Sequence, residues 1–82
     1  MSYEYKICCL INNEDEHHII MRDHEEIDLS SYECNDFSTK VEYDGIYFCD
    51  HIKSERSNEC FRKIIDHCLS FSEHLKIYEL KK

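Results

Sequence analysis

The last third of this chain repeats its apolar side chains at spacings of three and four residues. That spacing places them on one face of an α-helix and predicts a helix over residues 55–74. Ser54 or Ser57 supplies its N-cap, and Glu55 and Glu59 complement its positive end. A helix with a single apolar stripe needs a second layer to cover it. The stripe consists of Phe61, Ile64, Cys68, Phe71 and Leu75, with Ile65 alongside.

A β-hairpin is the second clear pattern, over residues 41–48. An Asp-Gly dipeptide lies at its centre, and this dipeptide favours a two-residue type I′ turn. Such a turn places Tyr43 opposite Ile46. The next pair on the same face is Val41 and Phe48, so the hairpin is expected to present one continuous apolar face.

The beginning of the chain predicts a second hairpin. Residues 3–11 alternate apolar and polar side chains as a strand does, and residues 17–22 return as another strand after a polar turn. A five-residue loop over residues 12–16 keeps the apolar faces of the two strands together, whereas a four-residue loop would not. The expected cross-strand pairs are Ile7 with Met21 and Cys9 with Ile19.

The segment between these hairpins gives a weaker pattern. Residues 25–29 alternate apolar and polar side chains and predict a short third strand that directs Ile27 and Leu29 inward. The two serines that follow suit the N-cap of a helical turn over residues 32–37.

A closing strand is expected at residues 76–80, because Ile77 lies far off the helical stripe. Together these elements predict an α+β fold: a small antiparallel sheet of four or five strands, with one amphipathic helix near the C-terminus packed on one face as a two-layer sandwich. At this length, residues 1–82 are expected to form a single domain.

The net negative charge of the chain is confined to its first half. Residues 1–39 hold 10 acidic and 2 basic side chains, net −8, and residues 40–82 hold 8 of each, net zero. The acidic side chains are interleaved with aromatic residues and histidines, as in a surface that contacts a protein. The candidate partner-binding residues are Glu14, Asp15, Glu16, Asp23, Glu25, Glu26, Asp28, Glu33 and Asp36.

This charge limits the partners of the chain. A net charge of −8 repels phosphates, so direct binding of nucleic acid or of an anionic membrane is not expected. The sequence contains neither a signal-peptide pattern nor an apolar stretch of membrane-spanning length, which predicts a cytoplasmic protein. In that compartment the six cysteines are expected to be reduced thiols.

No motif of an enzyme or of a metal centre is present. The chain has no glycine-rich phosphate loop, no G-x-S-x-G and no H-E-x-x-H, so it is not expected to be an enzyme or to need a cofactor. It also lacks the Cys-x-x-Cys pairs that usually announce a zinc site. Cys60, His67 and His74 share one flank of the helix at steps of seven residues, about 10.5 Å, too far to hold one ion.

These features predict a small acidic inhibitor that binds and blocks a basic, nucleic-acid-handling protein without catalysis. Its carboxylates would occupy sites that bind nucleic-acid phosphates, as a nucleic-acid mimic does. Two settings fit equally well: a phage anti-defence protein such as an anti-CRISPR, or an immunity protein or antitoxin that neutralises a nuclease toxin. The alternative is a Cys/His-rich module that is stabilised by a metal or works through its thiols. The simplest interpretation of the acidic residues is a surface that serves solubility alone.

The first prediction separates the inhibitor from a metal-stabilised module. We expect purified protein to contain no stoichiometric metal, and its melting temperature to be the same with and without a chelator. Elemental analysis and thermal denaturation measure these two properties. One equivalent of zinc, together with a collapse of the melting temperature in chelator, would reverse the ranking.

Overall fold

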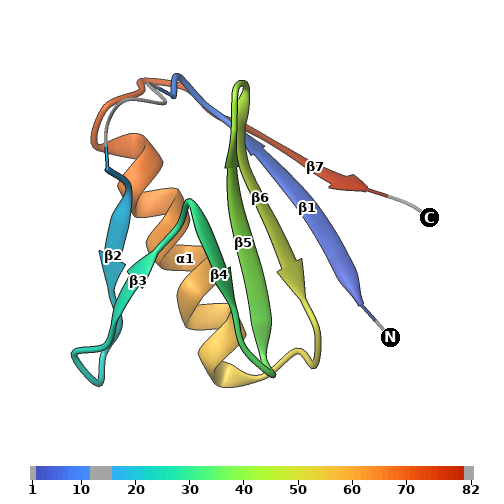
Figure 1. The fold of residues 1–82 in the computed structure, drawn as a ribbon. Coiled ribbons are helices and arrows are strands. Elements are labelled where there is room, and N and C mark those ends of the chain that lie inside the picture. Colours follow the sequence, from blue (N-terminus) through green and yellow to red (C-terminus); the bar gives the residue numbers. More distant parts are fainter. Residues whose placement is uncertain (1, 12–15, 81–82) are drawn as a thin grey trace.

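A computed structural model of the chain describes residues 2–11 and 16–80 (Figure 1). The turn expected over residues 12–16 lies largely outside the described residues. In chain order the elements are β1 (Tyr3–Cys8), β2 (His18–Ile20), β3 (Glu26–Asp28), β4 (Ser31–Glu33), β5 (Phe37–Glu42), β6 (Gly45–Asp50), α1 (Glu55–Leu69) and β7 (Lys76–Leu80).

The strands form two separate β-structures. Five of them make one antiparallel sheet in the order β4-β5-β6-β1-β7, and β2 and β3 make a two-stranded antiparallel ribbon. In Figure 1 the ribbon diverges from the sheet at the short connection between β3 and β4, and α1 lies behind them, in contact with both β2 and β6. The α+β class and the packing of one helix on an antiparallel sheet are confirmed.

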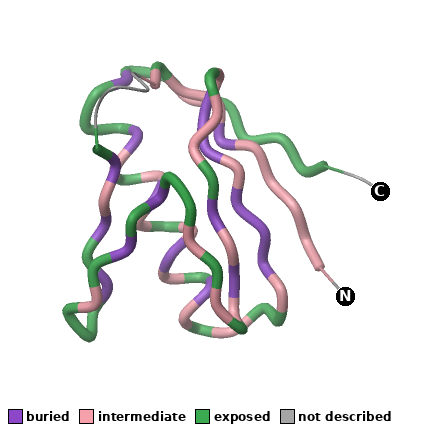
Figure 2. Tube along the Cα trace, in the orientation of Figure 1, coloured by how far each residue is buried: buried purple, intermediate pink, exposed green. Residues whose placement is uncertain are grey.

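The core lies where α1 meets the sheet and the ribbon, and Figure 2 shows the buried stretches facing that space. Phe61 of the helix packs on Tyr5 of β1 at a ring distance of 5.2 Å and on Phe48 of β6 at 5.4 Å. The ribbon contributes Ile19 and Ile27, both buried, to the same core. Helix α1 therefore packs its buried stripe against both the sheet and the ribbon, while its outer face stays exposed.

Helix α1 begins as expected but ends early. The Ser54 side chain accepts a hydrogen bond from the backbone N–H of Ser57, which is the predicted N-cap. The helix ends at Leu69, and the Ser70 backbone N–H donates to the carbonyl oxygens of His67 and Cys68. Residues 70–74 are not helical. Lys76–Leu80 forms the predicted closing strand.

The predicted hairpin between the first two strands is wrong. Strand β1 pairs with β6 and β7, so that Ile7 lies opposite Ile46 and Ile77, while β2 pairs with β3. The alternation of side chains sets which face of a strand is buried, but it carries no information about which strand is the neighbour. Here β1 pairs with two strands that are distant in the sequence, β6 and β7, and not with β2.

The helical turn predicted over residues 32–37 is also wrong. Residues Ser31–Glu33 form β4, which pairs with the start of β5. Tyr32 stacks on Phe37 at 5.4 Å, and this packing uses an extended backbone. The predicted strand at residues 25–29 is present as β3, with Ile27 and Leu29 fully buried as expected.

The β5–β6 hairpin is present with a shifted register. Val41 lies opposite Ile46 and Glu42 opposite Gly45, so the turn residues are Tyr43 and Asp44 rather than the Asp-Gly pair. Tyr43 is 83% exposed instead of buried. The cause is the close approach of β1. Gly45 has φ 155°, and a Cβ atom there would lie 2.1 Å from the carbonyl oxygen of Ile7.

This contact generates the second prediction. Gly45→Ala should lower the free energy of unfolding by at least about 2 kcal/mol, because backbone must move to admit the methyl group. Tyr43→Ala, two residues away in the exposed turn, should change it by no more than about 0.5 kcal/mol. Urea denaturation measures both. Equal effects of the two substitutions would show that β1 does not constrain the hairpin.

Candidate partner-binding surface

The β2–β3 ribbon divides its side chains between two faces. Ile19 and Ile27 lie opposite each other and point into the core. Their neighbours therefore point outward, because side chains alternate along a strand. We call the resulting surface the ribbon face. It consists of Glu16, His18, Ile20, Glu26 and Asp28.

The ribbon face combines negative charge with one apolar side chain. Ile20 is 59% exposed and lies directly opposite Glu26. His18 lies opposite Asp28, and Glu16 precedes the strand as an exposed residue. The fold therefore places a projecting isoleucine on the same face as three of the nine predicted acidic residues. Glu14 and Asp15 lie outside the described residues.

Histidine 18 is held in place by the carboxylates of this face. Its Nδ1 is 2.5 Å from Glu26 Oε1, and its Nε2 is 4.0 Å from Asp28 Oδ1. The hydrogen bond with Glu26, helped by the charges of Asp28 and Glu16, raises the pKa of His18 above 6.5. Protonation of His18 therefore makes the net charge of the ribbon face less negative as pH falls.

Asp23 and Glu25 are directed toward the helix instead. Arg56 of α1 forms ion pairs with both carboxylates, at 3.4 Å with Asp23 and more closely with Glu25. The Tyr32 hydroxyl donates to Glu25 at 2.8 Å, and this bond, followed by the one from Arg56, lowers the pKa of Glu25. These two acids fasten the ribbon to the helix, so their charge is partly neutralised within the protein.

Glu33 and Asp36 lie elsewhere. Glu33 is exposed on β4, where its partner Ser38 places it on the side of the sheet away from α1. Asp36 accepts a hydrogen bond from the Ser54 hydroxyl at 2.6 Å, and its backbone carbonyl accepts one from the His51 N–H at 2.9 Å. Asp36 thus positions the start of the helix rather than forming part of an outer acidic surface.

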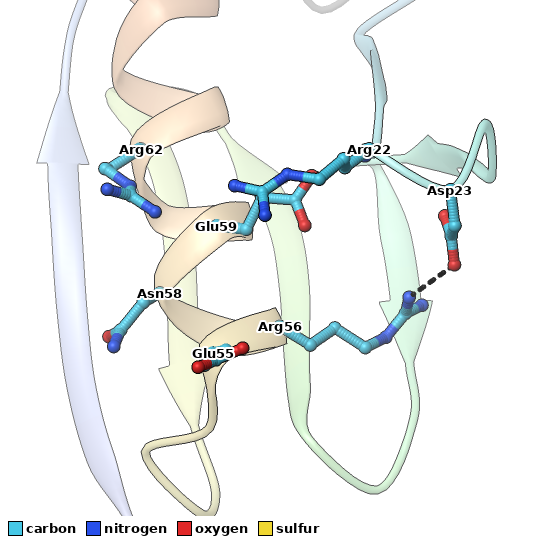
Figure 3. Close-up of a pocket in the computed structure, with 7 residues that line it drawn as sticks. All are labelled: Arg22, Asp23, Glu55, Arg56, Asn58, Glu59 and Arg62. Atoms are coloured by element: carbon cyan, nitrogen blue, oxygen red, sulfur yellow. Dashed lines mark hydrogen bonds and ion pairs between the residues drawn. The ribbon is translucent and has the colours of Figure 1, made fainter.

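A shallow hollow between α1 and the β2–β3 turn collects all three arginines of the chain, as Figure 3 shows. Its charges balance, since three acidic side chains lie among the three arginines. The backbone N–H of Arg22 donates to Glu59 Oε2 at 2.5 Å, which adds a second tie between helix and ribbon. The lining residues are Arg22, Asp23, Glu55, Arg56, Asn58, Glu59 and Arg62.

The sequence analysis did not predict this hollow. The only sequence feature that relates to it is that the chain has just three arginines, all of which line it. Arg22 is the only cation between Glu14 and Asp36, yet it sits beside two arginines of the helix. Arg22 is 34 positions from Arg56 and 40 from Arg62, so only the fold brings them together. The amino-acid composition could not predict this.

A histidine pair, with His17 buried and His67 half-buried, lies at the other end of the helix. His17 Nδ1 and His67 Nε2 are 2.9 Å apart, and Phe71 packs against both rings. Burial, and then the neighbouring His17 and His18, lower the pKa of His67 below 6.5. In residues 2–11 and 16–80, no group of three or more His, Cys, Asp or Glu side chains is arranged to hold a metal ion.

Comparison with known proteins identifies no relative: the chain matches no protein family, no curated protein and no solved structure. None of the helices in the described part of the chain is long and apolar enough to cross a membrane.

The third prediction concerns the two histidine environments. An NMR titration should give His18 a pKa above 6.5 and His67 a pKa below 6.5. Glu26→Gln should return the pKa of His18 toward 6.5, because the charged partner is lost, whereas Glu33→Gln should not. A pKa of His18 at or below 6.5 in the unmodified protein would contradict the observed pairing.

The pKa of His18 is raised and that of His67 is lowered, so the two histidines have opposite effects on how stability depends on pH. The His18–Glu26 pair stabilises the fold below pH 6.5, and this contribution is lost as pH rises through the raised pKa of His18. Because the pKa of His67 is lowered, its neutral form favours folding above pH 6.5, and stability falls as pH drops below that value.

Proposed function

We propose that this protein is a small acidic inhibitor whose ribbon face binds a basic, nucleic-acid-handling protein and blocks it without catalysis. The observation that carries the proposal is Ile20, which is 59% exposed among Glu16, Glu26 and Asp28. An exposed apolar side chain that shares a face with carboxylates resembles an interface anchor with a polar rim.

The two kinds of side chain have separate roles in binding. The carboxylates attract lysine and arginine side chains of the partner and raise the rate of association. They occupy positions that would otherwise hold nucleic-acid phosphates, so binding and blocking coincide. Ile20 loses its contact with water in the complex and slows dissociation. Direct binding of nucleic acid is disfavoured by the same negative charge.

The ribbon face is held in one conformation before binding. Ile19 and Ile27 anchor the ribbon in the core, and Arg56 ties its turn to α1 through Asp23 and Glu25. A surface that is already ordered loses less conformational entropy on association, so more of the contact energy appears as affinity. Asp23 and Glu25 therefore support binding by holding the ribbon in place, although they do not lie on the ribbon face.

Two biological settings remain equally suitable for such an inhibitor. A phage protein could block a nuclease-based defence, as anti-CRISPR proteins do, and an immunity protein or antitoxin could neutralise a nuclease toxin. Both require an acidic protein that competes with nucleic acid for a basic surface. The cytoplasm is the compartment in which either partner would be met, and we propose it as the location of this protein.

The fourth prediction tests the ribbon face with matched variants. The double variant E26K/D28K should lose a basic host protein that the unmodified protein retains from a nuclease-treated lysate. The control E73K/E79K carries the same change in charge at exposed residues outside the ribbon and should retain it. Mass spectrometry of the eluates identifies the retained protein, and added DNA should compete with its retention.

Kinetics with the purified partner then separates the two roles. We expect E26K/D28K to reduce the association rate by about tenfold at low salt and Ile20→Ala to act mainly on dissociation. Surface plasmon resonance across a salt titration measures both rates. An association rate independent of salt, or equal losses in the ribbon variant and its control, would leave the acidic surface with solubility as its only role.

A further inference from the structure

Two cysteines meet at the end of the core near the histidine pair. Cys9 directly follows β1 and is half-buried, and Cys68 is fully buried in the last turn of α1. Their sulfur atoms are 3.0 Å apart. A disulfide bond is about 2.05 Å long, so bond formation requires the sulfurs to approach by about 1 Å. Both are free thiols in this structure.

We propose that Cys9 and Cys68 form a dithiol site that is oxidised by a low-molecular-weight disulfide to an intrachain disulfide. The bond would join the end of β1 to the end of α1. The proposal goes beyond the inhibitor function and does not require it, since it rests on the contact between two sulfurs and on no feature of the ribbon face.

The reaction balances as a double thiol–disulfide exchange. The thiolate of Cys9, the more accessible of the two, attacks one sulfur of the small disulfide and releases one small thiol. The thiolate of Cys68 then attacks Cys9 Sγ in the mixed disulfide and releases the second small thiol. Two electrons pass from the protein to the reagent, and the two thiol protons end on the released thiols.

Burial sets the conditions for this exchange. Desolvation raises the pKa of both thiols, so only a small fraction of either is thiolate near neutral pH. The exchange should therefore be slow at neutral pH and should accelerate as pH rises. Once Cys9 has reacted, the second step gains from proximity, because Cys68 is already in contact with the target sulfur.

The neighbouring cysteines are poor substitutes. Cys8 precedes Cys9 in an extended segment and points to the opposite face. Cys60 is buried in the same helix as Cys68, but eight residues earlier, about 12 Å along the axis. These two residues therefore provide matched controls: one adjacent in sequence to Cys9, and one in the same helix and equally buried as Cys68.

The disulfide would cross-link two distant parts of the chain. It would enclose residues 9–68, which contain the ribbon, three of the five sheet strands (β4, β5 and β6) and most of α1. Closing so long a loop restricts the unfolded chain strongly, so the oxidised protein should melt about 10 °C or more above the reduced one. The same bond would fix the point from which the chain leaves β1 toward the ribbon.

The fifth prediction uses full-length protein incubated with oxidised glutathione at neutral and at mildly alkaline pH. The intact mass should fall by two hydrogens, faster at the higher pH. Tryptic digestion without reductant should join peptide 7–22, which holds Cys8 and Cys9, to peptide 64–76, which holds Cys68. A reducing agent should reverse both the mass change and the rise in melting temperature.

Variants assign the linkage to its two residues. Cys9→Ser and Cys68→Ala should each abolish the joined peptides, whereas Cys8→Ser and Cys60→Ala should retain them. If Cys68→Ala fails to fold, Cys9→Ser together with its neighbour Cys8→Ser decides the assignment. Persistence of six free thiols at alkaline pH, glutathione retained on Cys9, a different peptide pair or a linked dimer would each overturn the proposal.

Discussion

Burial of one stripe of α1 against both the sheet and the ribbon is the constraint on which the rest of the structure depends. A helix of 15 residues is marginally stable by itself in water, so it needs cover along its apolar stripe. The sheet covers one side through Tyr5 and Phe48, and the ribbon covers another through Ile19 and Ile27. A two-stranded ribbon is equally unstable in isolation, which makes the helix and the ribbon mutually dependent.

Packing against α1 explains how the ribbon can expose clustered carboxylates and an isoleucine on its outer side. Its inner isoleucines are held in the core, and Arg56 fixes the turn through Asp23 and Glu25. The outer side can then hold three carboxylates and an exposed Ile20 without loss of the fold. A surface serving solubility alone needs only the charge. The binding role that we propose also uses the isoleucine, as an apolar anchor.

The acidic first half of the chain thus performs several structural tasks. Some of its carboxylates fasten the ribbon, Asp36 positions the start of α1, and Glu33 lies on another side of the sheet. The candidate surface that remains is smaller than the sequence indicated, but its residues share one face. Counting charges along the sequence could not separate these roles, because each depends on a partner from a distant part of the chain.

The sequence by itself determined the α+β class, the closing strand and the burial of Ile27 and Leu29, since each follows from local periodicity. It also limited the start of α1 to Ser54 or Ser57, and the structure has Ser54 as the N-cap. Only the tertiary structure decided that β1 pairs with β6 and β7, because every strand offers the same backbone hydrogen bonds. It also decided the hairpin register, through the approach of Ile7 to Gly45, and the face that unites Glu16, Glu26 and Asp28 around Ile20. Those outcomes depend on contacts between residues far apart in the chain, which no local pattern records.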